Sequence, residues 1–135
     1  MNLHASAVTC GGKGVLLLGE SGSGKSDLAL RLMDRGATLV ADDRVEVLRE
    51  GDALWACSVP ALAGRIELRG VGILQRPYCA RAKLALAVRL VAREAVERMP
   101  EPEFFDCEAL RLPLVSLHAF DHSTPIKIHL ILEQH

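Results

Sequence analysis

The 135-residue chain has little surplus charge, few aromatic side chains and no long apolar run. Its 16 basic and 17 acidic side chains give a formal net charge of -1, whereas binding to nucleic-acid phosphates requires a basic surplus. One Trp, one Tyr and three Phe are too few for a platform that stacks single-stranded bases. No apolar stretch approaches the ~20 residues that cross a membrane. We therefore expect neither a nucleic-acid partner nor a membrane.

Cysteine is also scarce, and the four cysteines form no C-x-x-C pair. Such spacing is typical of reduced thiols, because a chain that is 50% hydrophobic needs no disulfides to hold a core. The first residues, Met1 to His4, lack the charged and apolar regions of a signal peptide. We expect a cytoplasmic protein that forms one domain over residues 1–135.

Short apolar runs alternate with glycine-containing turns, which favours an α/β fold with buried strands. A helix is predicted over Asp27–Arg35, with Gly36 ending it at the C′ position. Strands are predicted at Ala5–Cys10, Val15–Leu18, Thr38–Ala41, Ile66–Arg69 and Leu112–Leu117, and a hairpin at Val45–Leu48 and Leu54–Ser58.

Two segments allow more than one interpretation. Leu84–Val91 is apolar enough for a strand or a helix, and a strand is favoured. Ser123, Thr124 and Pro125 indicate a helix start, with a hydroxyl cap and a proline at the first helical position. The following Ile126–Leu132 is rich in isoleucine, so a strand is the alternative there.

The strongest motif is a glycine-rich loop directly after the aliphatic run Val15–Leu18. It fits G-x-x-x-x-G-K-[ST] in full and comprises Gly19, Glu20, Ser21, Gly22, Ser23, Gly24, Lys25 and Ser26. Glycines let successive backbone N–H groups converge on phosphate oxygens, and the helix that follows adds its positive end. The motif predicts that Lys25 contacts the β- and γ-phosphates of ATP and that the Ser26 hydroxyl ligates Mg²⁺.

A pair of carboxylates, Asp42 and Asp43, ends the next aliphatic strand. A strand-terminal Asp commonly holds Mg²⁺ in phosphate-loop proteins, and a second carboxylate could accept a proton from a hydroxyl. The alternative is a turn-forming Asp pair before Arg44, which is common. With the phosphate loop upstream, we favour the functional interpretation.

Three segments in this order resemble the catalytic domain of HPr kinase/phosphorylase. They are Gly19–Ser26, the strand that ends at Asp42 and Asp43, and Ile66–Ile73, which is similar to the signature segment of that family. The resemblance covers residues 4 to about 75. Three motifs in the family's order are far more specific than a phosphate loop alone.

The resemblance implies a P-loop domain of the phosphoenolpyruvate-carboxykinase-like type, with a mixed sheet and flanking helices. It implies a kinase that uses ATP and Mg²⁺ to phosphorylate a serine of HPr, the phosphocarrier protein of the phosphotransferase system. It also implies a reverse phosphorolysis that consumes phosphate and makes pyrophosphate. Members of the family assemble as hexamers, so a homo-oligomer is expected.

The resemblance gives nucleotide- and metal-binding roles to three residues. Lys25 matches the phosphate-binding lysine, Ser26 a Mg²⁺ ligand and Glu67 of the signature segment a second Mg²⁺ ligand. By spacing alone, Glu67 fits equally well as a solvated strand residue that pairs with Arg65 or Arg69.

It also gives roles in the chemical step. Asp43 matches the proton acceptor, with Asp42 as its neighbour, and His4 matches an active-site histidine ahead of the phosphate loop. Arg98 is the expected counterpart of a later catalytic arginine. Taken without the resemblance, His4 reads as a surface histidine near the end of the chain.

The sequence departs from the family after the signature segment. Residues 113–128 lack the lysine, Pro-Val and Gly-Arg-Asn elements that the family uses for dephosphorylation, so the reverse reaction is the less secure part of the expectation. The regulatory domain of longer members is expected to be absent, as in truncated proteobacterial forms. The alternatives are a P-loop kinase of a small metabolite and a non-catalytic ATP-sensing module.

Overall fold

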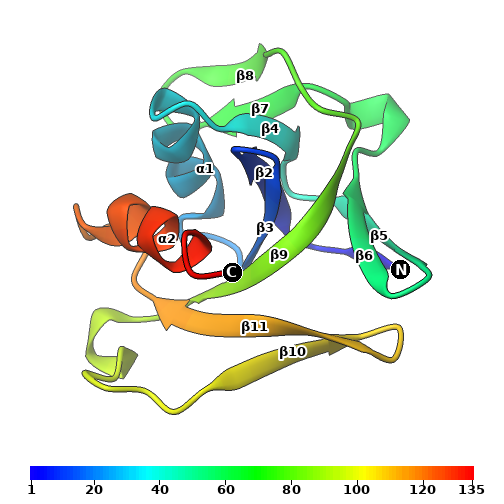
Figure 1. Cartoon of the computed structure of the whole chain (residues 1–135). Coiled ribbons are helices and arrows are strands. Elements are labelled where there is room, and N and C mark those ends of the chain that lie inside the picture. The colour runs from blue at the N-terminus through cyan, green and yellow to red at the C-terminus, as the bar shows by residue number, and fades with distance from the viewer.

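The computed structural model describes all residues, 1–135, as one curled nine-stranded sheet, two helices and a separate two-stranded arm (Figure 1). The sheet follows the order β1-β5-β6-β9-β3-β2-β4, and β11 pairs with β9 and with β10. Its strands are β1 (Asn2–Leu3), β2 (Ser6–Cys10), β3 (Lys13–Leu18), β4 (Thr38–Ala41), β5 (Val45–Glu50), β6 (Ala53–Cys57), β9 (Arg81–Leu90), β10 (Glu103–Cys107) and β11 (Leu110–Leu117).

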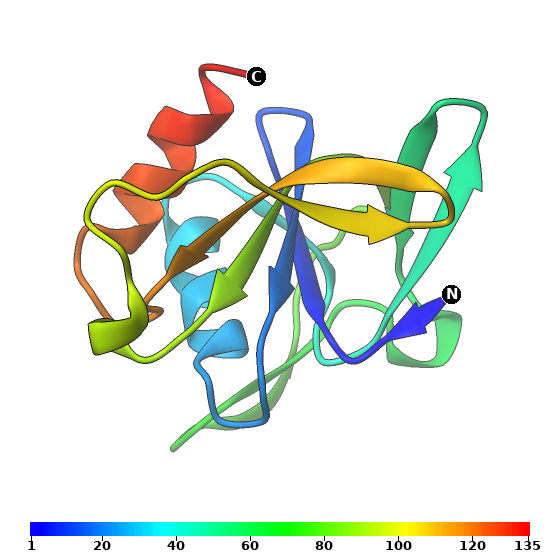
Figure 2. The same ribbon diagram turned by 90° about the horizontal axis from the view of Figure 1, so that it is seen from below.

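The middle of the sheet is parallel and its margins are antiparallel. Strand β3 runs parallel to β9, and β9 runs parallel to β11. Around them, β2 is antiparallel to both β3 and β4, and β6 is antiparallel to β9. The carboxyl ends of β3, β9 and β11 therefore lie at one edge of the sheet, where their arrowheads point the same way in Figure 2. In open α/β sheets this is the edge at which ligands bind.

Both helices, α1 (Lys25–Asp34) and α2 (Thr124–Leu132), cover the same face of the sheet (Figure 1). Leu28 and Leu32 of α1 and Ile128 of α2 are buried in one core cluster with residues of β2, β3 and β9. A second cluster on the opposite face contains no helical residue and is closed by the strands that curl over it. The mixed sheet is thus confirmed, but the helices lie on one side of it.

Helix α1 begins at Lys25, two residues before the predicted start, because the phosphate loop leads directly into the helix. Asp27 lies in its first turn, where a carboxylate interacts favourably with the helix dipole, and forms a 2.9 Å ion pair with Arg31. Gly36 has φ +103° and follows the last helical turn, so the predicted glycine stop is confirmed.

Ile126–Leu132 is helical, so the strand alternative is wrong. Ser123 precedes the helix with a helical backbone conformation, and its side chain accepts no capping hydrogen bond, which corrects the predicted hydroxyl cap. The hydroxyl of Thr124 instead donates to the carbonyl of His118. Pro125 is the second residue of the helix, one position later than predicted, because the helix begins at Thr124.

The signature segment forms an arm beside the sheet, in which β7 (Arg65–Leu68) and β8 (Gly72–Gln75) are antiparallel. Gly70, at φ +85°, lies in the turn between them, and Gly72, at φ +108°, is the first residue of β8. Two single-turn 3₁₀ helices, η1 (Pro60–Leu62) and η2 (Arg93–Ala95), complete the chain. Neither α1 nor α2 is long and apolar enough to cross a membrane.

Candidate active site

The glycine-rich loop connects the carboxyl end of β3 to the first turn of α1, as the motif requires. Gly22 and Gly24 have φ +83° and +100°, a backbone region that other residues enter only at a cost. At Gly24 a side chain would also clash with its surroundings, because a Cβ there would lie 2.7 Å from the Cβ of Ala119. The loop therefore depends on glycine at this position for two independent reasons.

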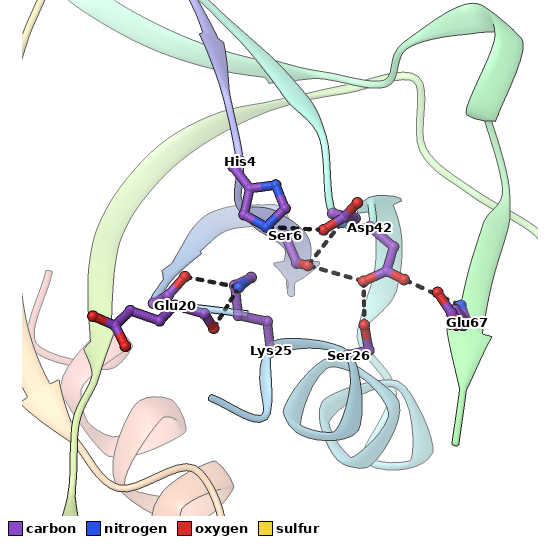
Figure 3. Close-up of polar contacts among 9 residues, drawn as sticks. His4, Ser6, Glu20, Lys25, Ser26, Asp42 and Glu67 are labelled. Carbon is purple, nitrogen blue, oxygen red and sulfur yellow. Dashed lines mark hydrogen bonds and ion pairs between the residues drawn. The ribbon is translucent and has the colours of Figure 1, made fainter. Parts of the chain in front are cut away.

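Lys25 is 7% exposed and folds back over the loop. Its Nζ donates to the carbonyl oxygens of Gly19, at 2.7 Å, and Glu20, at 3.0 Å (Figure 3). These two carbonyls hold the ammonium group beside the loop, at the amino end of α1. The lysine is thus positioned where a bound phosphate would meet both its charge and the helix N-terminus.

Asp42, at the end of β4, is the centre of a buried hydrogen-bond network (Figure 3). Its Oδ1 accepts hydrogen bonds from the hydroxyls of Ser26, at 2.7 Å, and Ser6, at 2.9 Å. Its Oδ2 accepts one from the backbone N–H of Glu67, at 3.1 Å. Asp42 therefore ties the phosphate loop, β2 and the arm together while it is 9% exposed.

Asp43 differs from its neighbour, since its side chain is 61% exposed and its backbone has φ +70°. A positive φ at a residue other than glycine is uncommon and is stored strain when the surroundings hold it. Here the backbone N–H of Asp43 donates to the hydroxyl of Ser6, at 3.1 Å. Its Oδ1 lies 3.2 Å from Nε2 of His4. The carboxylate is thus directed into open space with one histidine beside it.

Ser6 is not among the predicted site residues, yet it contacts the side chain of Asp42 and the backbone of Asp43. It is fully buried, donates to Asp42 and accepts from the backbone of Asp43. Only a hydroxyl can do both in so small a volume. No sequence motif marks it, because the serine lies in an otherwise apolar strand, between Ala5 and Ala7. Its position two residues after His4 is the single available signal.

Residues of the phosphate loop, the acid pair and the arm line one cleft of about 820 Å³. His4, Lys25, Ser26, Asp42, Asp43 and Glu67 all belong to its lining, together with the turn of the arm and Phe120. Arg98 is exposed and is not among the lining residues. The structure therefore brings every predicted site residue to the lining of the cleft except Gly19, Glu20 and Ser23 of the phosphate loop, and Arg98. The catalytic role of Arg98 stays a prediction.

Phe120 and its neighbour Asp121 come from the loop between β11 and α2. Arg93 forms a hydrogen bond and an ion pair with Asp121, which hold the pKa of that carboxyl below its ordinary value.

On the helical face of the sheet, burial raises the pKa of the Cys10 thiol to about 11. All four cysteines are free.

The oxygen donors of the cleft fit a divalent cation of the hard type. The hydroxyl of Ser26 and the carboxylates of Asp42 and Glu67 are the donors that Mg²⁺ accepts, usually with water and phosphate oxygens in the remaining positions. Before any metal binds, Ser26 and Asp42 are already hydrogen-bonded to each other. The site thus fits Mg²⁺ held jointly by the chain and by a nucleotide.

The fold and the cleft are those of a mixed α/β protein with a phosphate-loop motif facing a pair of carboxylates. The family model described as HPr serine kinase C-terminal domain matches residues 1–98. Since the match spans more than half of the sequence, the chain belongs to this family.

Individual relatives agree with this assignment. The HPr kinase/phosphorylase of Cupriavidus metallidurans is 36% identical over 128 residues, which are 87% of this chain and 40% of that protein. The HPr kinase/phosphorylase of Caldanaerobacter subterraneus is 49% identical over 75 residues, which are 55% of this chain and 25% of that protein. The chain thus spans less than half the length of the curated relatives it matches.

A solved structure matches over the whole chain. It is the Hpr(Ser) kinase/phosphatase from Coxiella burnetii, with a TM-score of 0.88 at 26% sequence identity. The superposition covers 100% of this chain and 95% of that one. The curled sheet with both helices on one face is therefore an arrangement shared with that protein.

Proposed function

We propose that the chain is an HPr serine kinase that transfers the γ-phosphoryl group of ATP, with Mg²⁺, to a serine of the phosphocarrier protein HPr. The observation that carries the proposal is the single cleft in which Lys25 and Ser26 face Asp42 and Asp43, in a chain of the HPr serine kinase family. The proposal includes the P-loop fold type of phosphoenolpyruvate carboxykinase and a homo-oligomeric assembly, which in this family is a hexamer.

The groups in the cleft account for the bond formed, the bond broken and the proton released in the proposed reaction. The serine oxygen of HPr forms a bond to the γ-phosphorus, the bond from that phosphorus to the β–γ bridging oxygen breaks, and ADP leaves. Asp43 accepts the serine proton late in the transfer. Lys25 and the backbone N–H groups of the loop stabilise the negative charge on the transferred group. Ser26, Asp42 and Glu67 are the residues that would hold Mg²⁺, which would supply further neutralisation of the phosphate oxygens.

His4 acts on the base rather than on the substrate. Its Nε2 lies 3.2 Å from the Asp43 carboxylate, and both side chains are more than half exposed. This contact with the ring keeps the carboxylate in one orientation, so that its other oxygen faces the acceptor hydroxyl. Asp43 is thereby fixed at the backbone by Ser6 and at the side chain by His4.

The experiment is incubation of the chain with HPr, ATP and Mg²⁺, followed by mass spectrometry of HPr. We expect one added phosphoryl group on a serine, and no transfer by Asp43→Asn, which retains ATP binding because its side chain makes no contact with the phosphate loop. Asp52→Asn, in the exposed turn between β5 and β6, is the matched control and should remain active. Addition of inorganic phosphate to phosphorylated HPr tests the reverse reaction.

Absence of phosphoserine in HPr, with ATP binding intact, would refute the proposed substrate. ATP consumption stimulated by a small metabolite would then identify a metabolite kinase. Tight ATP binding without turnover would identify a nucleotide-sensing module.

A further inference from the structure

The loop between β11 and α2 presents an aromatic ring to the cleft. Phe120 is 53% exposed, and it lines the cleft together with Gly24 and Lys25. A Cβ at Gly24 would lie 2.8 Å from Cζ of Phe120. The ring therefore packs against the phosphate loop on one side and is open to the cleft on the other.

The position of this ring is fixed by contacts of the loop backbone. Arg31 of α1 donates hydrogen bonds to the carbonyls of Ala119 and Asp121, the residues on either side of Phe120. Arg93, after β9, pairs with Asp121 at 2.7 Å. The ring of His118 meets that of Phe120 edge to face, with centroids 5.8 Å apart. A half-exposed ring held in place in this way is ready to stack on a ligand without first being ordered.

The sheet topology shows which part of a nucleotide would lie there. The phosphate loop follows β3, and the acid pair follows β4, which is separated from β3 by β2. Phe120 follows β11, on the other side of β3, beyond β9. A triphosphate on the loop with its γ-phosphate towards Asp43 therefore extends its nucleoside end away from the acid pair, towards the carboxyl ends of β9 and β11 (Figure 2).

We propose that Phe120 is the nucleobase seat of the cleft, against whose exposed face the base of the ATP donor stacks. This inference rests on the proposed use of ATP and adds a recognition residue to it. Every base has a π-face, and stacking on an aromatic ring is tolerant of base identity. The seat therefore accepts nucleoside triphosphates as a class, so GTP binds to it as ATP does.

The test compares two ligands that share the triphosphate but differ in the nucleoside. Binding of Mg·ATP and of Mg·tripolyphosphate is measured by calorimetry for the wild type, Phe120→Ala and Phe120→Trp. We expect Phe120→Ala to weaken ATP roughly 10-fold, the loss of one base–aromatic stack, and to leave tripolyphosphate unchanged. Phe120→Trp should retain ATP affinity. Phe104→Ala, which truncates a 48% exposed ring on β10, is the matched control and should change neither ligand.

Each other result overturns the inference. Equal weakening of both ligands would mean that the ring merely supports the phosphate loop. Unchanged ATP affinity with a raised KM for HPr would mean that Phe120 contacts the acceptor protein. A wild type that binds neither ligand would remove the proposed function together with the seat, whereas unchanged ATP binding in Phe120→Ala removes the seat alone.

Discussion

Replacing Ser6 by alanine tests whether one buried hydroxyl holds the acid pair in its working geometry. The substitution removes a 2.9 Å hydrogen bond to Oδ1 of Asp42 and the acceptor of the Asp43 backbone N–H. Oδ1 of Asp42 keeps the hydrogen bond from Ser26, so that carboxylate is not stripped of partners. The N–H of Asp43 loses its only side-chain acceptor, at a residue whose φ of +70° is already strained.

The magnitude follows from these two contacts. A hydrogen bond to a charged group contributes about 1.5–3 kcal/mol, and a buried donor left without a partner costs about 1–3 kcal/mol. Because the side chain of Asp43 is 61% exposed, water can replace part of the second contact. We therefore expect Ser6→Ala to lower the free energy of unfolding by about 2–3 kcal/mol. Freed motion of Asp43 should lower kcat about tenfold with the KM for ATP nearly unchanged, since Lys25 and the loop are untouched.

Urea denaturation and steady-state transfer to HPr measure the two effects separately. Ser58→Ala is the control, because its exposed hydroxyl makes only a 3.4 Å hydrogen bond and its loss should change stability by less than about 0.5 kcal/mol. A Ser6→Ala variant within about 0.5 kcal/mol of the wild type in stability and with unchanged kcat would refute the positioning role.

Two further substitution or labelling experiments test the surroundings of the site. Gly24→Ala should destabilise the chain by about 2–4 kcal/mol and weaken ATP binding, because both its φ of +100° and the 2.7 Å approach to Ala119 oppose a Cβ. Gly22→Ala, at positive φ but in open space, should cost only about 1–2 kcal/mol, so equal losses for the two variants would contradict the steric argument. For Cys10, a pKa of about 11 means that the thiolate is about 100-fold scarcer at pH 8 than in a thiol with the ordinary value of 9.0. Native-state labelling followed by mass spectrometry should therefore modify Cys79 well before Cys10, and rapid labelling of Cys10 would show that it is not buried in the core.

The predictable part of the fold was local. Val15–Leu18, the glycine loop and Gly36 each carry their own backbone requirement, so β3, the loop and the end of α1 could be predicted. The edge strands were harder, because β8 is exposed along its whole length and β10 nearly so, and neither carries a strong pattern of burial. The partnership of β3 with β9 could not be predicted either, since long-range pairing leaves no signal in either strand alone.

The site likewise contains residues that local motifs predict and residues that only long-range contacts bring into place. Lys25, Ser26, Asp42 and Asp43 belong to motifs whose chemistry is readable from spacing, and the cleft contains all four. Ser6 and Phe120 belong to no motif. Their importance arises only when β2 meets β4 and the loop after β11 meets the phosphate loop.

The pairing of β3 with β9 has a consequence for how the chain acquires its binding site. Leu16, Leu17 and Leu18 pair with Ala87, Val88 and Arg89, about seventy positions later in the chain. Pairing over such distances slows folding, because loop closure must come before the stabilising contacts form. During synthesis the phosphate-loop motif is complete early but has no supporting parallel neighbour until β9 has left the ribosome. A nascent chain that contains the whole motif is therefore still unable to bind a nucleotide, because the strand that supports the loop is missing.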